Sequence, residues 1–182
     1  MAYEHGVDRI WLVNVGDLKP MELPISFFLD YAWNPAEWPK ERLPEYTKSW
    51  AAEQFGAEHA SEIARMLDLY TQFNGRRKPE LLSPETYSLT DFREFERIVE
   101  DYNQLASQAE TLSGKLPPEQ KDAFYQLVLH PVTACANLNE LYLAVAKNRQ
   151  AAVQGRATAN DWAEKVRQLY QKDADITEYY HT

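Results

Sequence analysis

The chain has 182 residues, of which 45% are apolar and 26% are charged, and its formal net charge is −9. These values are typical of a globular protein, and a chain of this length should bury roughly 70% of its unfolded surface. The acidic balance, with no basic stripe interleaved with aromatic residues, argues against nucleic acid as a partner. A single cysteine, Cys135, excludes an internal disulfide framework.

No run of about 18 apolar residues occurs, so no membrane-spanning segment is expected. The first ten residues also lack the basic and apolar regions of a secretory signal. The polypeptide as it stands is expected to stay where it is made, and its compartment is left open.

Residues 10–15 form a continuous apolar run that is rich in β-branched and aromatic side chains. Such a run is typical of a strand that is buried on both faces, as in a parallel sheet. Gly16 and Pro20 argue against a helix here. No second segment has this character, so the strand would need to pair with a sheet that other segments supply. If the strand stayed unpaired and exposed, it could cause self-association. The alternative is an extended arm that docks on the helical bundle.

The rest of the chain has helical periodicity. Residues 23–32 predict a short apolar helix, and two prolines then interrupt regular structure. Two helices follow, one ending at Gly56 and one at Asn74-Gly75, and residues 76–89 have no helical period. Three long helices are predicted to complete the chain. The first begins near Thr90 and carries Phe92 and Phe95 on its apolar face. The second is expected to kink at Pro131. The sequence therefore predicts a mainly α protein, a bundle of about five to six helices preceded by one orphan β-strand.

The turn that follows the predicted strand carries the polar groups best placed for chemistry. If the strand belonged to a parallel sheet, this turn would lie at the sheet edge where ligands bind. Four polar side chains occur there within nine positions, an amide, two carboxylates and an ammonium group: Asn14, Asp17, Glu22 and Lys19. Together they could orient sugar hydroxyls and pair with an anionic substrate. In the alternative interpretation Asp17 caps the turn, and Lys19 and Glu22 are solvated.

Three stretches make the chain recognisable: GVDRIWLVNVGDLKPMELPISFFLDYAWNP, YTQFNGRRKPELLSPETYSL and DAFYQLVLHPVTACANLNELYLAVAKNR. The first resembles the end of the catalytic barrel in glycoside hydrolase family 115, and the others resemble the helical domain that follows it. The resemblance implies that residues 1–43 are the last strand and helix of an incomplete (β/α) barrel and residues 44–182 a helical bundle. It also implies an α-glucuronidase that removes (4-O-methyl)glucuronic acid from α-1,2 linkages on xylan with inversion.

Within that family the asparagine of the NVGDLKP stretch contributes to the active site, so the resemblance implies a role for Asn14 in holding the catalytic water or the glucuronate. Asp17 and Lys19 are weaker candidates in the same stretch. Arg76 and Arg77 could pair with the uronate carboxylate. Alternatively they complement the dipole of the preceding helix or join barrel to bundle.

Other features have competing interpretations. Trp33 and Trp38 could form a xylan-stacking platform or pack around the proline-rich segment. The scattered histidines form no HxH or HExxH motif, so neither a metal nor another cofactor is expected. Full-length family members are expected in the periplasm or outside the cell.

An inverting glycosidase needs two carboxyl groups about 6.5–9.5 Å apart across the sugar. In the family these come mainly from barrel segments that precede this strand. The sequence therefore predicts a fragment that is inactive alone and that acts on glucuronoxylan only within the full-length enzyme. A stand-alone helical scaffold or protein-interaction module is the alternative, and a carbohydrate-binding module using Trp33 and Trp38 is a weaker one.

Overall fold

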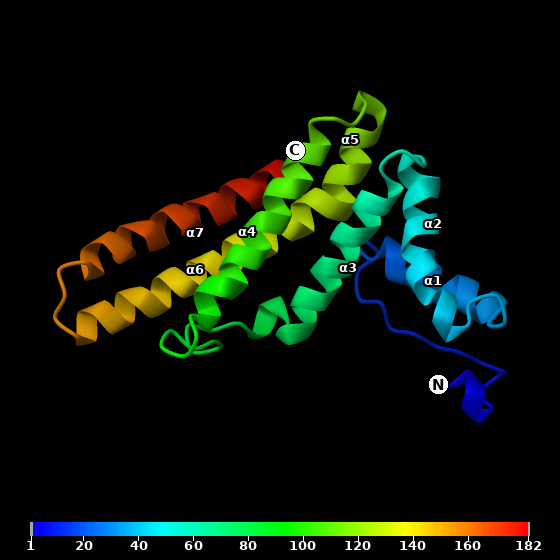
Figure 1. Cartoon of the computed structure of the whole chain (residues 1–182), viewed down its shortest axis with the longest axis horizontal. Helices are drawn as coiled ribbons and strands as arrows, with labels where there is room; N and C mark the ends of the chain where they lie inside the picture. The colour runs from blue at the N-terminus through cyan, green and yellow to red at the C-terminus, as the bar shows by residue number, and fades with distance from the viewer. Residues whose placement is uncertain (1, 182) are drawn as a thin grey trace. The chain divides into compact units, whose positions relative to one another are not determined.

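The structure, a computed structural model, describes residues 2–181, and helices account for most of them (Figure 1). The chain divides into two compact units, Met1–Asp68 and Leu69–Thr182. Helices dominate both units, which confirms the prediction of a mainly α helical bundle. The predicted boundary at residues 43 and 44 concerns which residues would join a barrel rather than how they pack, and it stays a prediction.

The predicted strand at residues 10–15 does not form. This segment has no regular secondary structure, and the side chains of Ile10 and Leu12 are 84% and 96% exposed. A strand requires hydrogen bonds to a neighbouring strand, and no segment within residues 2–181 supplies one. Instead, Trp11 stacks on Tyr31 with ring centroids 5.6 Å apart. The segment is therefore an arm held on the helix that carries Tyr31, within its own unit.

The first unit contains two complete helices and the start of a third: α1 (Glu22–Trp33), α2 (Leu43–Phe55) and α3 (Ala60–Arg76). Pro44 lies in the first turn of α2, where a backbone N–H would have no acceptor within the helix, so its missing N–H costs no hydrogen bond. Gly56 ends the helix with a φ of 80°. Aromatic side chains join α1 to α2, because Phe27 packs edge-on against Tyr46 at 4.9 Å. The Tyr46 hydroxyl also donates to Asp30 Oδ2 at 2.6 Å.

The second unit contains the end of α3 and the long helices: α4 (Glu94–Ser113), α5 (Pro118–Phe124), α6 (His130–Val153) and α7 (Ala159–His181). A π-helical turn, Tyr125–Leu129, joins α5 to α6, and Pro131 is the second residue of α6. Proline cannot donate a backbone hydrogen bond, and its ring clashes with the carbonyl four residues earlier. The wider turn lets the chain continue into α6 at that point.

In this unit α6 packs against both α4 and α7 (Figure 1). On α4 the buried side chains recur every three or four residues and form one apolar face: Phe95, Ile98, Val99, Tyr102, Leu105, Ala106, Ala109 and Leu112. Asn137 of α6 is buried, and its Nδ2 donates to the carbonyl of Leu169 in α7 at 3.0 Å. This bond fixes the two helices in one register.

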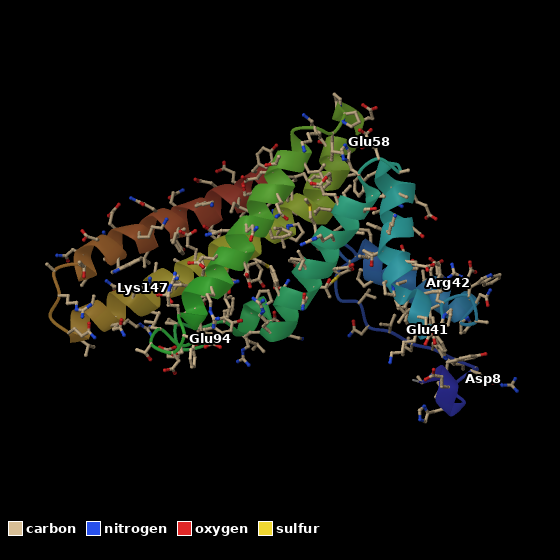
Figure 2. All side chains as sticks on the ribbon, in the orientation of Figure 1. Asp8, Glu41, Arg42, Glu58, Glu94 and Lys147 are labelled. Atoms are coloured by element: carbon tan, nitrogen blue, oxygen red, sulfur yellow. The ribbon has the colours of Figure 1, made fainter. Side chains whose placement is uncertain are left out.

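Lys147 of α6, labelled in Figure 2, links all three helices. Its Nζ lies 3.0 Å from Glu96 Oε1 of α4 and 4.9 Å from the ring centre of Trp162 in α7. Burial alone would raise the pKa of Glu96, but hydrogen bonding and the charge of Lys147, with that of Arg93, lower this pKa below its ordinary value of 4.5. Glu96 therefore stabilises the folded state most when it is ionised.

Replacing Lys147 with Met should lower the free energy of unfolding by about 1–3 kcal/mol at pH 7, because Glu96 keeps its charge and loses its cation. The stabilisation is present above pH 4.5 and is lost as the pH falls through the lowered pKa of Glu96. The difference between the two proteins should therefore shrink in acid, as urea titrations at pH 7 and pH 3 would measure. Lys172→Met, at an exposed position of α7, is the control. An equal loss at both pH values would contradict this account.

Candidate functional site

The turn at residues 14–21 is built by two local hydrogen bonds. The backbone N–H of Gly16 donates to Asn14 Oδ1 at 3.1 Å, and Gly16 has a φ of 65°, which glycine adopts without strain. The N–H of Met21 then donates to the carbonyl of Leu18 at 2.9 Å, across a cis peptide bond between Lys19 and Pro20. These bonds define the path of the backbone that carries the predicted site.

The predicted residues of this turn are largely open to solvent. Asn14, Asp17 and Lys19 are exposed, and Glu22 is half-buried in the first turn of α1. Because Asn14 Oδ1 accepts the turn hydrogen bond, its Nδ2 group is the part available to donate to a ligand oxygen. The turn thus presents an amide donor, an ammonium group and the Asp17 carboxylate to solvent, with the half-buried Glu22 carboxylate at its end.

The two predicted arginines belong to the second unit, and each has a structural partner there. Arg76 Nη2 lies 2.8 Å from Asp101 Oδ2 of α4, and its guanidinium carbon lies 4.5 Å from the ring centre of Phe73. Arg77 Nε donates to the carbonyl of Leu81 at 3.1 Å, which ties it to the short helix Pro79–Leu81. Arg77 thus stabilises its own loop through this hydrogen bond, whereas Arg76 lines a hollow on the surface of the second unit.

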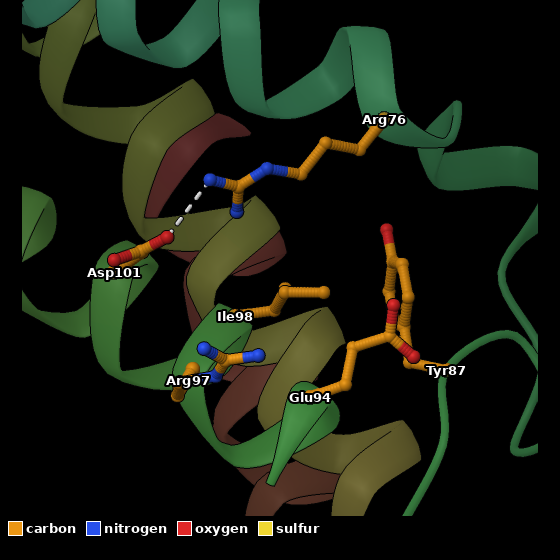
Figure 3. Close-up of a pocket in the computed structure, with 6 residues that line it drawn as sticks. All are labelled: Arg76, Tyr87, Glu94, Arg97, Ile98 and Asp101. Carbon is orange, nitrogen blue, oxygen red and sulfur yellow. Dashed lines mark hydrogen bonds and ion pairs between the residues drawn. The ribbon is translucent and has the colours of Figure 1, made fainter. Parts of the chain in front are cut away.

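That hollow has a volume of about 560 Å³ and lies wholly in the second unit (Figure 3). Its six lining residues come from the end of α3, the loop before α4, and one side of α4: Arg76, Tyr87, Glu94, Arg97, Ile98 and Asp101. Of these six residues, only Arg76 was predicted from the sequence as a site residue. Glu94, Arg97 and Asp101 are spaced at i, i+3 and i+7, which places them on one face of a helix. This spacing was the feature of the sequence that could have indicated the hollow.

The loop before α4 is ordered by hydrogen bonds that position Tyr87 and Glu94. The N–H of Ser88 donates to Glu94 Oε2 at 2.8 Å, and the N–H of Phe95 donates to the carbonyl of Ser88 at 3.1 Å. The Tyr87 ring packs edge-on against Phe95 at 5.2 Å. Burial raises the pKa of the Tyr87 hydroxyl, an effect that nearby Arg76 reduces, so this group stays a neutral donor near pH 7.

The two tryptophans differ in environment. Trp33 is 91% exposed, whereas Trp38 is half-buried, packs edge-on against Tyr46 at 4.8 Å and lies beneath the Arg42 guanidinium. Trp38 is therefore engaged in packing within the first unit.

The remaining ionisable groups do not assemble into a metal centre. His130 stacks on Tyr180 at 4.2 Å, and burial, with His181, lowers its pKa. Burial also raises the pKa of the Cys135 thiol, which favours the unreactive protonated form. Across residues 2–181 no group of three or more His, Cys, Asp or Glu could hold a metal ion. In the same range, no helix has the length and apolarity needed to cross a membrane.

Comparison with known proteins relates the chain to one group of enzymes. The family model of Glycosyl hydrolase family 115 matches residues 1–81. A solved structure, described as a novel family GH115 4-O-methyl-alpha-glucuronidase, BtGH115A, with specificity for decorated arabinogalactans, matches 98% of this chain with a TM-score of 0.79 and 28% sequence identity. The chain covers 24% of the length of that structure. No curated protein matches the chain. The fold and the sequence thus both relate this chain to glycoside hydrolase family 115, which confirms the resemblance carried by its motifs.

Proposed function

We propose that the chain works as part of a glycoside hydrolase that removes glucuronic acid, or its 4-O-methyl form, from polysaccharide side chains. The similarity to BtGH115A over 98% of the chain supports this proposal, because it extends through both units. The chain corresponds to about a quarter of that enzyme's length, so the rest of the active site would come from other segments.

In this proposal residues 1–43 contribute to the catalytic barrel and residues 44–182 form a supporting helical domain. The exposure of Ile10, Leu12 and Val13 is consistent with this, because a strand buried on both faces in a barrel would bury these side chains. The same exposed apolar side chains would also suit a protein-interaction module, the competing function. Glucuronidase activity that depends on Asn14 separates the two.

The proposed reaction is hydrolysis with inversion at the anomeric carbon. A general base takes a proton from water as its oxygen attacks that carbon, and a general acid protonates the departing glycosidic oxygen. Both carboxyl groups would come mainly from segments outside this chain. The Nδ2 group of Asn14 would donate to the water or to the glucuronate, fixing its position for attack. Asp17, Lys19 and Glu22 would act on the same sugar from the same turn.

The polysaccharide that carries the glucuronate is the finer part of the proposal. The sequence motifs resemble those of enzymes that act on α-1,2 linkages in xylan, whereas BtGH115A is specific for decorated arabinogalactans. We propose glucuronoxylan as the substrate, and a direct comparison of the two polymers tests this choice. Faster release from decorated arabinogalactan by the complete enzyme would contradict it.

The isolated chain should release no glucuronic acid from either polymer, because an inverting hydrolase needs both carboxyl groups around one sugar. The measurement is chromatographic detection of free (4-O-methyl)glucuronic acid after long incubation with glucuronoxylan and with decorated arabinogalactan. BtGH115A incubated with decorated arabinogalactan is the positive control. Reproducible release by the purified 182-residue chain would contradict the proposal that the remaining catalytic groups lie elsewhere.

A further inference from the structure

The hollow of the second unit has the size and lining of a small-ligand site. Its volume of about 560 Å³ falls within the ~300–1,000 Å³ that is usual for such sites. Figure 3 shows Arg76 and Asp101 joined on one side, Tyr87 on another, and Glu94 and Arg97 between them. The lining combines planar charged groups with one aromatic ring and one apolar side chain, Ile98.

The side chains that line this hollow offer more unused hydrogen-bond donors than unused acceptors. One oxygen of Asp101 accepts from Arg76, and one oxygen of Glu94 accepts from the Ser88 N–H, so both carboxylates are already partly satisfied. Arg76 uses one of its N–H groups for that bond and retains others. The Arg97 guanidinium forms no ion pair or hydrogen bond with any side chain among residues 2–181 and is exposed. A ligand that brings acceptor oxygens would therefore complement the hollow.

The geometry favours a carboxylate on a polar ring over a bare anion. A guanidinium can bind a carboxylate through two parallel N–H bonds, and Arg97 is held near the hollow by a rigid helix. The protonated Tyr87 hydroxyl and the second oxygens of Glu94 and Asp101 could meet sugar hydroxyls, which both donate and accept. A single small anion would leave these groups without partners.

We propose that this hollow binds a uronic acid residue, a sugar that carries a carboxylate, through residues other than those of the Asn14 turn. The inference rests on the proposed function, because a glucuronidase meets such sugars along its polymer. In that setting the hollow would hold a second acidic decoration or a released product. Its occupancy would tether the polymer without contributing to bond cleavage.

The test is titration of the 182-residue chain with glucuronic acid, glucose and acetate, followed by calorimetry and by NMR shifts of backbone amides. Glucuronic acid should bind, and it should shift the amides of residues 94–101 and of Tyr87. Glucose and acetate should each bind at least tenfold more weakly, because each supplies half of the recognised groups. Equal binding of acetate would overturn the inference, since it would indicate a site for any carboxylate.

Arg97→Gln removes the unpaired guanidinium and should weaken glucuronate binding at least tenfold without lowering the unfolding temperature. Arg76→Gln should weaken binding too, although it also breaks the bond to Asp101. Arg167→Gln replaces an exposed arginine of α7 that does not line the hollow, and it should bind as the parent does. Unchanged affinity in Arg97→Gln, or no binding by the parent, would overturn the inference. Neither result bears on the release assay, which tests the proposed hydrolase function by itself.

Discussion

Asn14→Ala should lower kcat by roughly 100–1,000-fold in a hybrid of BtGH115A that carries residues 6–35 of this chain in place of its own aligned segment. This is the usual cost of removing a hydrogen-bond donor that acts on the reacting groups. The chain presents Asn14 Nδ2 at an exposed turn, with Oδ1 occupied by the Gly16 N–H. The measurement is the initial rate of 4-O-methylglucuronic acid release at saturating substrate.

Asn14→Asp separates a catalytic role from a structural one. An aspartate keeps the oxygen that accepts from Gly16 but has no Nδ2 donor. If the Nδ2 donor acts in catalysis, Asn14→Asp should therefore lower kcat as much as Asn14→Ala does. Asn34→Ala, at an exposed asparagine after α1, is the matched control and should leave the rate unchanged. Full activity in Asn14→Asp would show that Asn14 only shapes the turn.

Phe95→Ala should lower the free energy of unfolding of the chain by about 3–5 kcal/mol. Phe95 is fully buried at the centre of a cluster with Val99, Leu143 and Ala146, where α4 meets α6. The truncation leaves a cavity that these side chains cannot fill. Urea titration followed by helical circular dichroism measures the change.

The same substitution removes the ring on which Tyr87 packs, so it should also weaken glucuronate binding in the hollow. Tyr170→Ala is the matched control, because Tyr170 is 70% exposed on α7 and its loss should cost less than about 0.5 kcal/mol. A loss below 1 kcal/mol in Phe95→Ala would contradict the assignment of this cluster to the hydrophobic core.

The helical part of the fold could be predicted from the sequence because its signal is local. The spacing of Phe95, Val99, Tyr102 and Ala109 predicts one apolar face, and the structure buries all four. The start of that helix was predicted too early, near Thr90, with Phe92 on the same face. Phe92 is instead 88% exposed, and both Phe92 and Arg93 have positive φ angles, so α4 begins at Glu94.

The start was misplaced because apolar spacing does not record backbone conformation. Hydrogen bonds to Ser88 from Asp91 and Phe95 turn the chain sharply before the helix begins. These contacts depend on the loop as a whole, whereas the periodicity of Phe92 and Phe95 depends only on the sequence.

The prediction of the strand was wrong and the hollow was missed for a different reason, since both depend on contacts between distant segments. Continuous apolarity at residues 10–15 indicates burial on two faces but does not specify by what, and nothing within residues 2–181 pairs with it. Arg76, Tyr87 and Arg97 come from three consecutive pieces of chain whose approach depends on packing of α3, the loop and α4. Of the predicted groups, those of the Asn14 turn are near one another because they are near in sequence.

The assignment of the Asn14 turn to a glucuronidase active site can be tested by the activity of the hybrid enzyme itself on decorated arabinogalactan, the polymer for which BtGH115A is specific. If residues 6–35 supply the same active-site turn, the hybrid should keep kcat/KM within about tenfold of the parent, a change of ~1.4 kcal/mol. Circular dichroism and the unfolding temperature establish that both enzymes are folded. A folded hybrid with no detectable release of 4-O-methylglucuronic acid would contradict the claim that this turn belongs to a glucuronidase active site.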